Sequence, residues 1–239
     1  RVVLYVFGPK LARECGGATI LAWMAVATIL ISSLIALKKD NLKARLAFST
    51  IGQLSYIVLG IAILSPLSTA GALYHLVAHA FMKITLFMCA GAIFVTTHKK
   101  DISEMVGLGR RMPVTMSAFT IASLGIAGFP FFVGFVSKAN IIMGALKTGQ
   151  LLFGATLIVS AVFALTYLMP VVLITFKREP VNPEFNTYGE ASKTMLVPLL
   201  ITATVSVILG VAPNFGLHLL DLAMSTGEAV FARAGGVIC

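Results

Sequence analysis

The sequence predicts an all-α polytopic membrane protein, a bundle of about six to seven transmembrane helices. Of its 239 residues, 58% are hydrophobic and 11% are charged, and the mean hydropathy is +0.97. Soluble domains contain about 25% charged residues. A helix needs about 20 apolar residues to cross the hydrocarbon core, and several runs approach or exceed this length. The runs are continuous rather than alternating, which favours helices over the strands of a membrane barrel.

The expected spans follow one another with short polar connections. They comprise residues 17–37, 46–64, 71–95, 114–128 continuing into 129–146, 151–176 and 195–220. We expect residues 1–16 to be the end of a preceding apolar segment and a linker, 17–220 to form the membrane domain, and 221–239 to be a C-terminal tail. Because the chain starts at Arg1 without a signal-peptide pattern, we also expect it to begin within a longer protein.

The net charge of +9 does not indicate nucleic-acid binding, because the basic residues gather in short loops. Eight Lys and Arg residues lie in the loops 38–45 and 97–113, the distribution that the positive-inside effect produces, so we expect this side to be cytoplasmic. Asp40 and Asn41 in the first loop are expected to cap the helix that follows. The cysteines lack metal-ligand spacing and no glycine-rich phosphate or dinucleotide motif is present, so we expect neither a metal nor a cofactor.

Three titratable side chains interrupt the third span at a spacing of four residues: His75, His79 and Lys83. Residues four apart lie on one helix face, so these groups form a polar stripe about 12 Å long. Lys83 lies twelve residues from each end of its span, too deep for its side chain to reach water easily. An ionisable group at this depth is expected to face a protein interior or a hydrated path. A single structural histidine would not explain three such groups in register.

The stretch GIAGFPFFVGF, residues 125–135, predicts a discontinuous helix near 128–138. Gly128, Pro130 and Gly134 interrupt it, because proline removes a backbone donor and glycine relaxes the local geometry. Inside a membrane such a break persists only where it is buried in protein or lines a cavity. Lys138 follows the break, so we expect it to join the polar stripe. A simple loop between a short span and a tilted span is the alternative.

These four basic residues, His75, His79, Lys83 and Lys138, are called the His/Lys line below. Histidine titrates near physiological pH and buried lysine can act as a proton acceptor, so such groups can pass protons along if water fills the gaps. Further polar side chains are expected to support that water: Lys43, Ser49, Thr50, Ser55, Tyr74 and Thr85. Two histidines four residues apart could also bind zinc, but no third ligand lies nearby in the sequence.

Four motifs carry a resemblance to a known family. They are DNLKARLAFSTIGQLSY (40–56), HLVAHAFMKITLFMCAG (75–91), DISEMVGLGRRMP (101–113) and FPFFVGFVSKANII (129–142). In this order they resemble the antiporter-like membrane subunits shared by Mrp-type cation/proton antiporters, respiratory complex I and membrane-bound hydrogenases. The resemblance covers most of residues 17–176.

The resemblance implies proton or cation translocation through buried charged residues at mid-membrane. His75, His79 and Lys83 match the family's central relay positions, and Lys138 matches the lysine of its broken helix. The family fold contains two inverted five-helix repeats, and this chain is similar to the second, with a repeat core at 44–176. The first repeat of the family, which supplies a buried Glu and another broken-helix Lys, has no counterpart here.

We therefore expect a subunit of a multisubunit complex in a lipid bilayer, the inner membrane of a prokaryote. It is expected to move protons, either alone or in exchange for Na⁺ or K⁺. An Mrp-type antiporter D-like subunit is the first hypothesis. A proton-pumping subunit of NADH:quinone oxidoreductase or of a membrane-bound hydrogenase is the alternative, and any redox chemistry would belong to that complex. An independent solute transporter with a cationic centre and an inert scaffold are further alternatives.

Overall fold

The computed structural model describes residues 2–177, 180 and 183–236, which form helices joined by turns and loops, without a β-strand. The predicted all-α membrane bundle is confirmed, and the chain is an integral membrane protein. Five of the described helices are long and apolar enough to cross a membrane: α2 (Gly17–Lys38), α3 (Leu42–Ala62), α4 (Pro66–Thr97), α8 (Leu151–Lys177) and α9 (Lys193–Val211). Their outward faces expose large hydrophobic side chains such as Ile20 and Met24, as lipid-facing surfaces do.

Shorter elements complete the order of the chain. They are η1 (Val2–Phe7), α1 (Gly8–Glu14), η2 (Ile102–Met105), α5 (Leu108–Arg111), α6 (Pro113–Ala127), α7 (Val133–Lys147), η3 (Pro183–Asn186) and α10 (Leu219–Gly236). The segment 1–16 contains η1 and α1, and the segment expected as a C-terminal tail forms most of α10. Residues 237–239 lie outside the described part of the chain.

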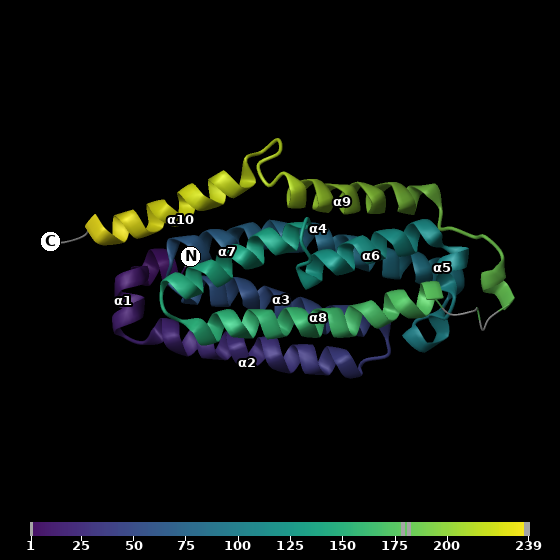
Figure 1. Cartoon of the computed structure of the whole chain (residues 1–239), viewed down its shortest axis with the longest axis horizontal. Coiled ribbons are helices and arrows are strands. Elements are labelled where there is room, and N and C mark those ends of the chain that lie inside the picture. The colour runs from purple at the N-terminus through teal and green to yellow at the C-terminus, as the bar shows by residue number, and fades with distance from the viewer. Residues whose placement is uncertain (1, 178–179, 181–182, 237–239) are drawn as a thin grey trace.

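α6 and α7 form one interrupted span, as predicted, rather than the alternative of two spans joined by a simple loop. Each helix has 15 residues, about 22 Å of helix, which is shorter than the ~30 Å hydrocarbon core. Figure 1 shows the two helices end to end, together following the length of α8. The predicted discontinuous helix near 128–138 is therefore confirmed. α6 ends at Ala127 and is capped by Gly128, whose φ of 85° is left-handed.

Treating α6 and α7 as a single span changes which loops share an end of the bundle. The amide Nε2 of Gln150 donates to the carbonyl of Ile63 at 3.2 Å, so the α7–α8 turn lies where α3 meets α4. The backbone N–H of Gly107 donates to the carbonyl of Ile174 at 3.1 Å, which places the end of α8 beside the second basic loop. The α8–α9 connection therefore joins the basic loops on the side expected to be cytoplasmic.

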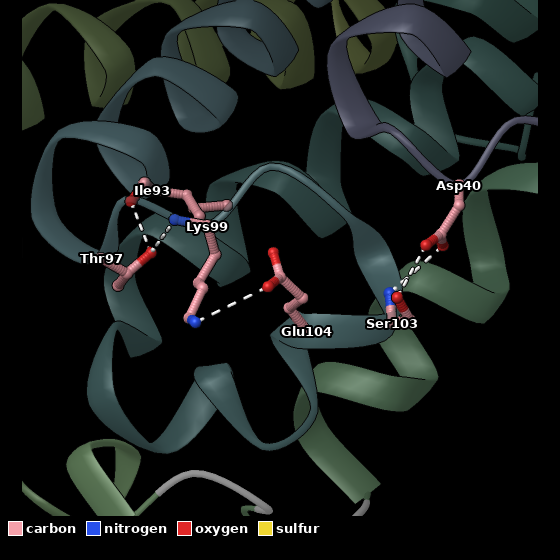
Figure 2. A network of polar contacts seen from close by, with 6 residues as sticks. All are labelled: Asp40, Ile93, Thr97, Lys99, Ser103 and Glu104. Atoms are coloured by element: carbon pink, nitrogen blue, oxygen red, sulfur yellow. Dashed lines mark hydrogen bonds and ion pairs between the residues drawn. The ribbon is translucent and has the colours of Figure 1, made fainter.

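Contacts between the two basic loops hold the start of α3 against the end of α4. The side-chain oxygen of Asn41 accepts a hydrogen bond at 3.1 Å from the backbone N–H three residues later, so Asn41 caps α3 as predicted. Asp40 does not cap the helix, because its carboxylate accepts from the N–H of Ser103 at 3.2 Å and from the Ser103 hydroxyl at 2.7 Å (Figure 2). Lys99 and Glu104, 3.6 Å apart, complete this surface network (Figure 2).

α4 lies at the centre of the bundle and carries three of the four residues of the His/Lys line. It packs against α3, α6, α7, α9 and α10. α9 and α10 run one after the other along one flank of α4 (Figure 1). Gly227 of α10 packs so closely on α4 that a Cβ atom would lie 2.6 Å from the carbonyl oxygen of Pro66. The face of α4 that carries the ionisable side chains is thus covered by protein, as such side chains require, while Leu76 and Ile84 on its other side stay exposed.

Candidate functional site

The antiparallel hairpin of α3 and α4 sets the depth of each polar group. Tyr56 of α3 lies level with His75 of α4, with ring centroids 5.5 Å apart. Further along the pair, the ammonium of Lys83 donates to the carbonyl of Leu46 at 3.0 Å. All four residues of the His/Lys line are buried, with exposed fractions between 0% for His75 and 7% for His79.

Lys138 reaches from α7 to the end of α6. Its ammonium donates to the carbonyl of Ile126, in the last turn of α6, where carbonyl oxygens lack helical partners and carry partial negative charge. The same ammonium lies 4.9 Å from the ring centroid of Tyr56. A Cβ atom at Gly128 would lie 2.9 Å from Cδ of Lys138. The glycine at the break therefore leaves the space through which the lysine side chain passes.

The other two residues of the predicted break have different positions. Gly134, the second residue of α7, lies so close to α6 that a Cβ atom would overlap the carbonyl oxygen of Gly125. Pro130 lies exposed in the turn between the two helices. The break thus joins two half-helices that touch, and it frees the carbonyl of Ile126 for Lys138.

His75 forms a hydrogen bond with Ser137 of α7. The Ser137 hydroxyl donates to the carbonyl of Gly134 at 3.0 Å and lies 2.7 Å from Nδ1 of His75. In the arrangement in which the single hydroxyl hydrogen points at that carbonyl, Nδ1 is the donor in the second contact. The Nε2 atom of His75 is then an acceptor, and it has no hydrogen-bond partner among the described protein atoms.

His79 continues the line from His75 towards Lys83. The two imidazole centroids are 6.2 Å apart. Nε2 of His79 is also buried, and no described side chain or backbone group pairs with it. Within the described ranges, neither Lys83 nor Lys138 forms a salt bridge with a carboxylate. The structure therefore brings together two ammonium groups that donate to backbone carbonyls, with two imidazoles between them.

Three further residues at this site were not singled out from the sequence. Tyr56 and Ser137 contact the His/Lys line directly. Gln53 lies between Leu46 and Tyr56 on α3, and its buried Oε1 finds no partner in the described part of the chain. Sequence spacing could have identified two of them, because Ser49, Gln53 and Tyr56 repeat at helical intervals on an apolar helix.

The side chains expected to support water are divided between this site and other places. The Thr50 hydroxyl donates at 2.9 Å to the carbonyl of Leu46, the same oxygen that Lys83 uses. Ser49 accepts from the hydroxyl of Tyr167 on α8 at 2.9 Å.

The remaining supporting candidates lie away from the His/Lys line. Tyr74 donates to the carbonyl of Leu209 on α9 at 2.7 Å. Lys43 is exposed at the bundle end, with its ammonium 4.7 Å from the ring centroid of Phe94. Ser55 and Thr85 each donate to the carbonyl four residues earlier in their own helix.

Comparison with known proteins decides the family. A family model described as NADH:quinone oxidoreductase/Mrp antiporter, TM, matches residues 9–164. The chain belongs to this family. A relative named NADH-quinone oxidoreductase subunit N, from Desulforudis audaxviator, is 36% identical over 202 residues, which are 80% of this chain and 40% of the relative. The family resemblance predicted from the four motifs is confirmed, and the chain spans about two fifths of that relative's length.

Solved structures show the same family fold. A chain in the Mrp complex from Dietzia sp. DQ12-45-1b superposes with a TM-score of 0.83 at 22% identity, covering 94% of this chain and 50% of that one. A chain of respiratory complex I from Thermus thermophilus superposes with a TM-score of 0.81 at 22% identity, covering 96% and 49%. At these identities the likeness establishes the fold, so function must be argued from the side chains.

Proposed function

We propose that this chain moves protons across the membrane, alone or in exchange for a monovalent cation, along the His/Lys line. The observation that supports this most directly is the pair of ammonium groups buried in a membrane bundle and bonded to backbone carbonyls instead of carboxylates. An ionisable side chain at this depth is costly and marks ion pathways in membrane proteins. The two buried Nε2 atoms between the lysines, which no described protein group pairs with, are suited to bind water that links them.

The geometry suggests how charge would pass along the line. A proton leaving Lys138 can reach Nε2 of His75, whose Nδ1 is held by Ser137. His79 lies one helical turn further, and Lys83 one turn beyond that, each about 6 Å along the axis. In a low dielectric, a charge at one end of such a line changes the proton affinity at the other, so the groups titrate as a coupled set.

We further propose that the chain works inside a multisubunit complex in a prokaryotic cytoplasmic membrane, with the basic loops on the cytoplasmic side. The Mrp-type antiporter D-like subunit remains one candidate. The 36% identity to a subunit of NADH-quinone oxidoreductase favours the second candidate, a redox-driven proton pump. In that case the redox centres belong to other subunits, and this chain contributes only the proton path.

The test measures acidification of inverted membrane vesicles that contain the full-length protein in its complex. Lys83→Ala and Lys138→Ala are compared with Lys147→Ala. Lys147 is an exposed lysine at the end of α7, the helix that also carries Lys138. We expect both buried-lysine variants to assemble and to lose translocation, while Lys147→Ala keeps it. Full translocation in either buried-lysine variant would refute the proposal and favour the scaffold hypothesis.

The driving force distinguishes the two assemblies. A redox-driven pump acidifies vesicles when NADH is added, whereas an antiporter dissipates an existing pH gradient when Na⁺ or K⁺ is added. Both responses should disappear in Lys138→Ala. Substrate uptake that proceeds without any proton movement would instead support an independent solute transporter.

A further inference from the structure

Tyr56 is a buried aromatic residue that contacts both His75 and Lys138. Its exposed fraction is 0%. The imidazole of His75 stacks on its ring with an interplanar angle of 17° and a centroid distance of 5.5 Å. The ammonium of Lys138 lies 4.9 Å from the same centroid. One ring of α3 therefore meets a residue of α4 and a residue of α7.

The ring of Tyr56 provides electrostatic attraction for the ammonium of Lys138. The face of an aromatic ring carries negative charge density, and it attracts a cation that lies within about 6 Å of the centroid, most strongly where water is excluded. Lys138 has a second partner in the carbonyl of Ile126 but, within residues 2–177, 180 and 183–236, no carboxylate partner. The ring and the carbonyl are thus the groups that hold this ammonium in place.

The hydroxyl of Tyr56 fixes where the ring lies. It donates to the carbonyl of Leu157 on α8 at 3.3 Å. Ser160 lies beside it on the same helix, and the hydroxyl of Ser160 is 3.5 Å from that of Ser33 on α2. The hydroxyl is thus bonded to a different helix from the two that the ring contacts, so ring and hydroxyl can be tested separately.

We propose that Tyr56 is the positioning residue of the His/Lys line, and this rests on the proposed function. Its ring holds the ammonium of Lys138 at the end of α6 and keeps the imidazole of His75 parallel to it. The ring is the part that matters for translocation, and the hydroxyl only anchors the ring to α8. No proton passes through the phenol in this role.

The experiment uses the full-length protein in its complex, in inverted vesicles, with rates divided by the amount of assembled complex. Tyr56→Leu removes the ring, and we expect the translocation rate to fall about 2- to 30-fold, the range that a cation–π attraction spans. Tyr56→Phe keeps the ring, and we expect it to restore the rate to within about twofold of the wild type. Phe119→Leu removes an equally buried ring of α6 from the apolar core and should leave the rate unchanged.

Two results would overturn the proposal. One is a wild-type rate in Tyr56→Leu, and the other is a loss in Tyr56→Phe as large as that in Tyr56→Leu, which would assign the role to the hydroxyl. If Tyr56→Leu lowers the amount of complex, Tyr56→Met replaces it, since methionine fills irregular space without a ring.

Lys138→Ala, measured in the same vesicles, separates failure of this proposal from failure of the proposed function. If Lys138→Ala keeps its rate, the proposed function is wrong. If Lys138→Ala loses translocation while the ringless Tyr56 variants keep it, only the role of Tyr56 is wrong.

Discussion

Replacing Gly128 with alanine should disable Lys138 without touching any titratable group. Gly128 has a φ of 85°, a left-handed conformation that costs a residue with a Cβ atom roughly 1–2 kcal/mol. The new Cβ would lie 2.9 Å from Cδ of Lys138, whereas carbon atoms in contact stay about 3.5–4.0 Å apart. The lysine chain must therefore move by roughly 0.5–1 Å, the difference between those distances.

That shift weakens the hydrogen bond between the ammonium of Lys138 and the carbonyl of Ile126. A hydrogen bond to a charged group contributes about 1.5–3 kcal/mol, so its loss corresponds to roughly a 10- to 150-fold effect. We expect Gly128→Ala to lower the thermal midpoint of the complex and to reduce vesicle acidification at least about tenfold.

Gly149→Ala is the matched control for backbone strain. Gly149 also has a left-handed φ, 74°, but a Cβ atom there would meet nothing within 4 Å. It should therefore lose a similar amount of stability, about 1–2 kcal/mol, and keep its translocation rate. If both variants translocate equally well, the space at Gly128 does not matter to Lys138 and the reasoning is wrong.

Three other changes test the surroundings of the site. Ser137→Ala leaves the Nδ1 donor of His75 without an acceptor, which costs about 1–3 kcal/mol, and we expect slower acidification in vesicles. Thr50→Asp puts a carboxylate beside Lys83, and at about 4 Å this carboxylate favours the charged form of the lysine by about 4 kcal/mol. Lys83 should then stay charged and translocation should stop, whereas the uncharged variant Thr50→Asn should retain it. Asn41→Ala removes the cap of α3 and should lower stability by about 1 kcal/mol in thermal unfolding without changing the rate per complex.

Local periodicity is sufficient to predict one face of the site. His75, His79 and Lys83 lie on a single helix, so a four-residue spacing places them together whatever the rest of the fold does. The break before Lys138 is equally local, because glycine and proline act on the backbone where they stand. These features could be predicted from the sequence. In the structure all four side chains are buried, and the imidazole centroids of His75 and His79 are 6.2 Å apart.

The groups contributed by neighbouring helices could not be predicted in the same way. Tyr56 meets Lys138 only because α3 and α7 both pack against α4. Lys43 shows the converse, since it was expected to support water along the line, yet it lies exposed over Phe94 at the bundle end. Side-chain direction at a helix end depends on the neighbouring loop, which sequence spacing does not describe.

The path of the interrupted span also depends on geometry that hydropathy does not describe. Residues 114–146 are long enough to suggest two short spans, and only the conformation of the turn decides between a hairpin and a continuation. Gly128 and Phe131 both take a positive φ there, and the result is two half-helices end to end (Figure 1). This arrangement points the carbonyl end of α6 at Lys138.

The choice of carbonyl partners for both lysines explains why this site would be able to switch. A carboxylate at about 4 Å would favour the charged ammonium by roughly 4 kcal/mol at an effective dielectric of 20, nearly a thousandfold. A backbone carbonyl carries only a partial charge, so it orients Lys83 and Lys138 without fixing their protonation. The charge on each lysine can then respond to its neighbours in the line, which is the property that coupled proton transfer requires.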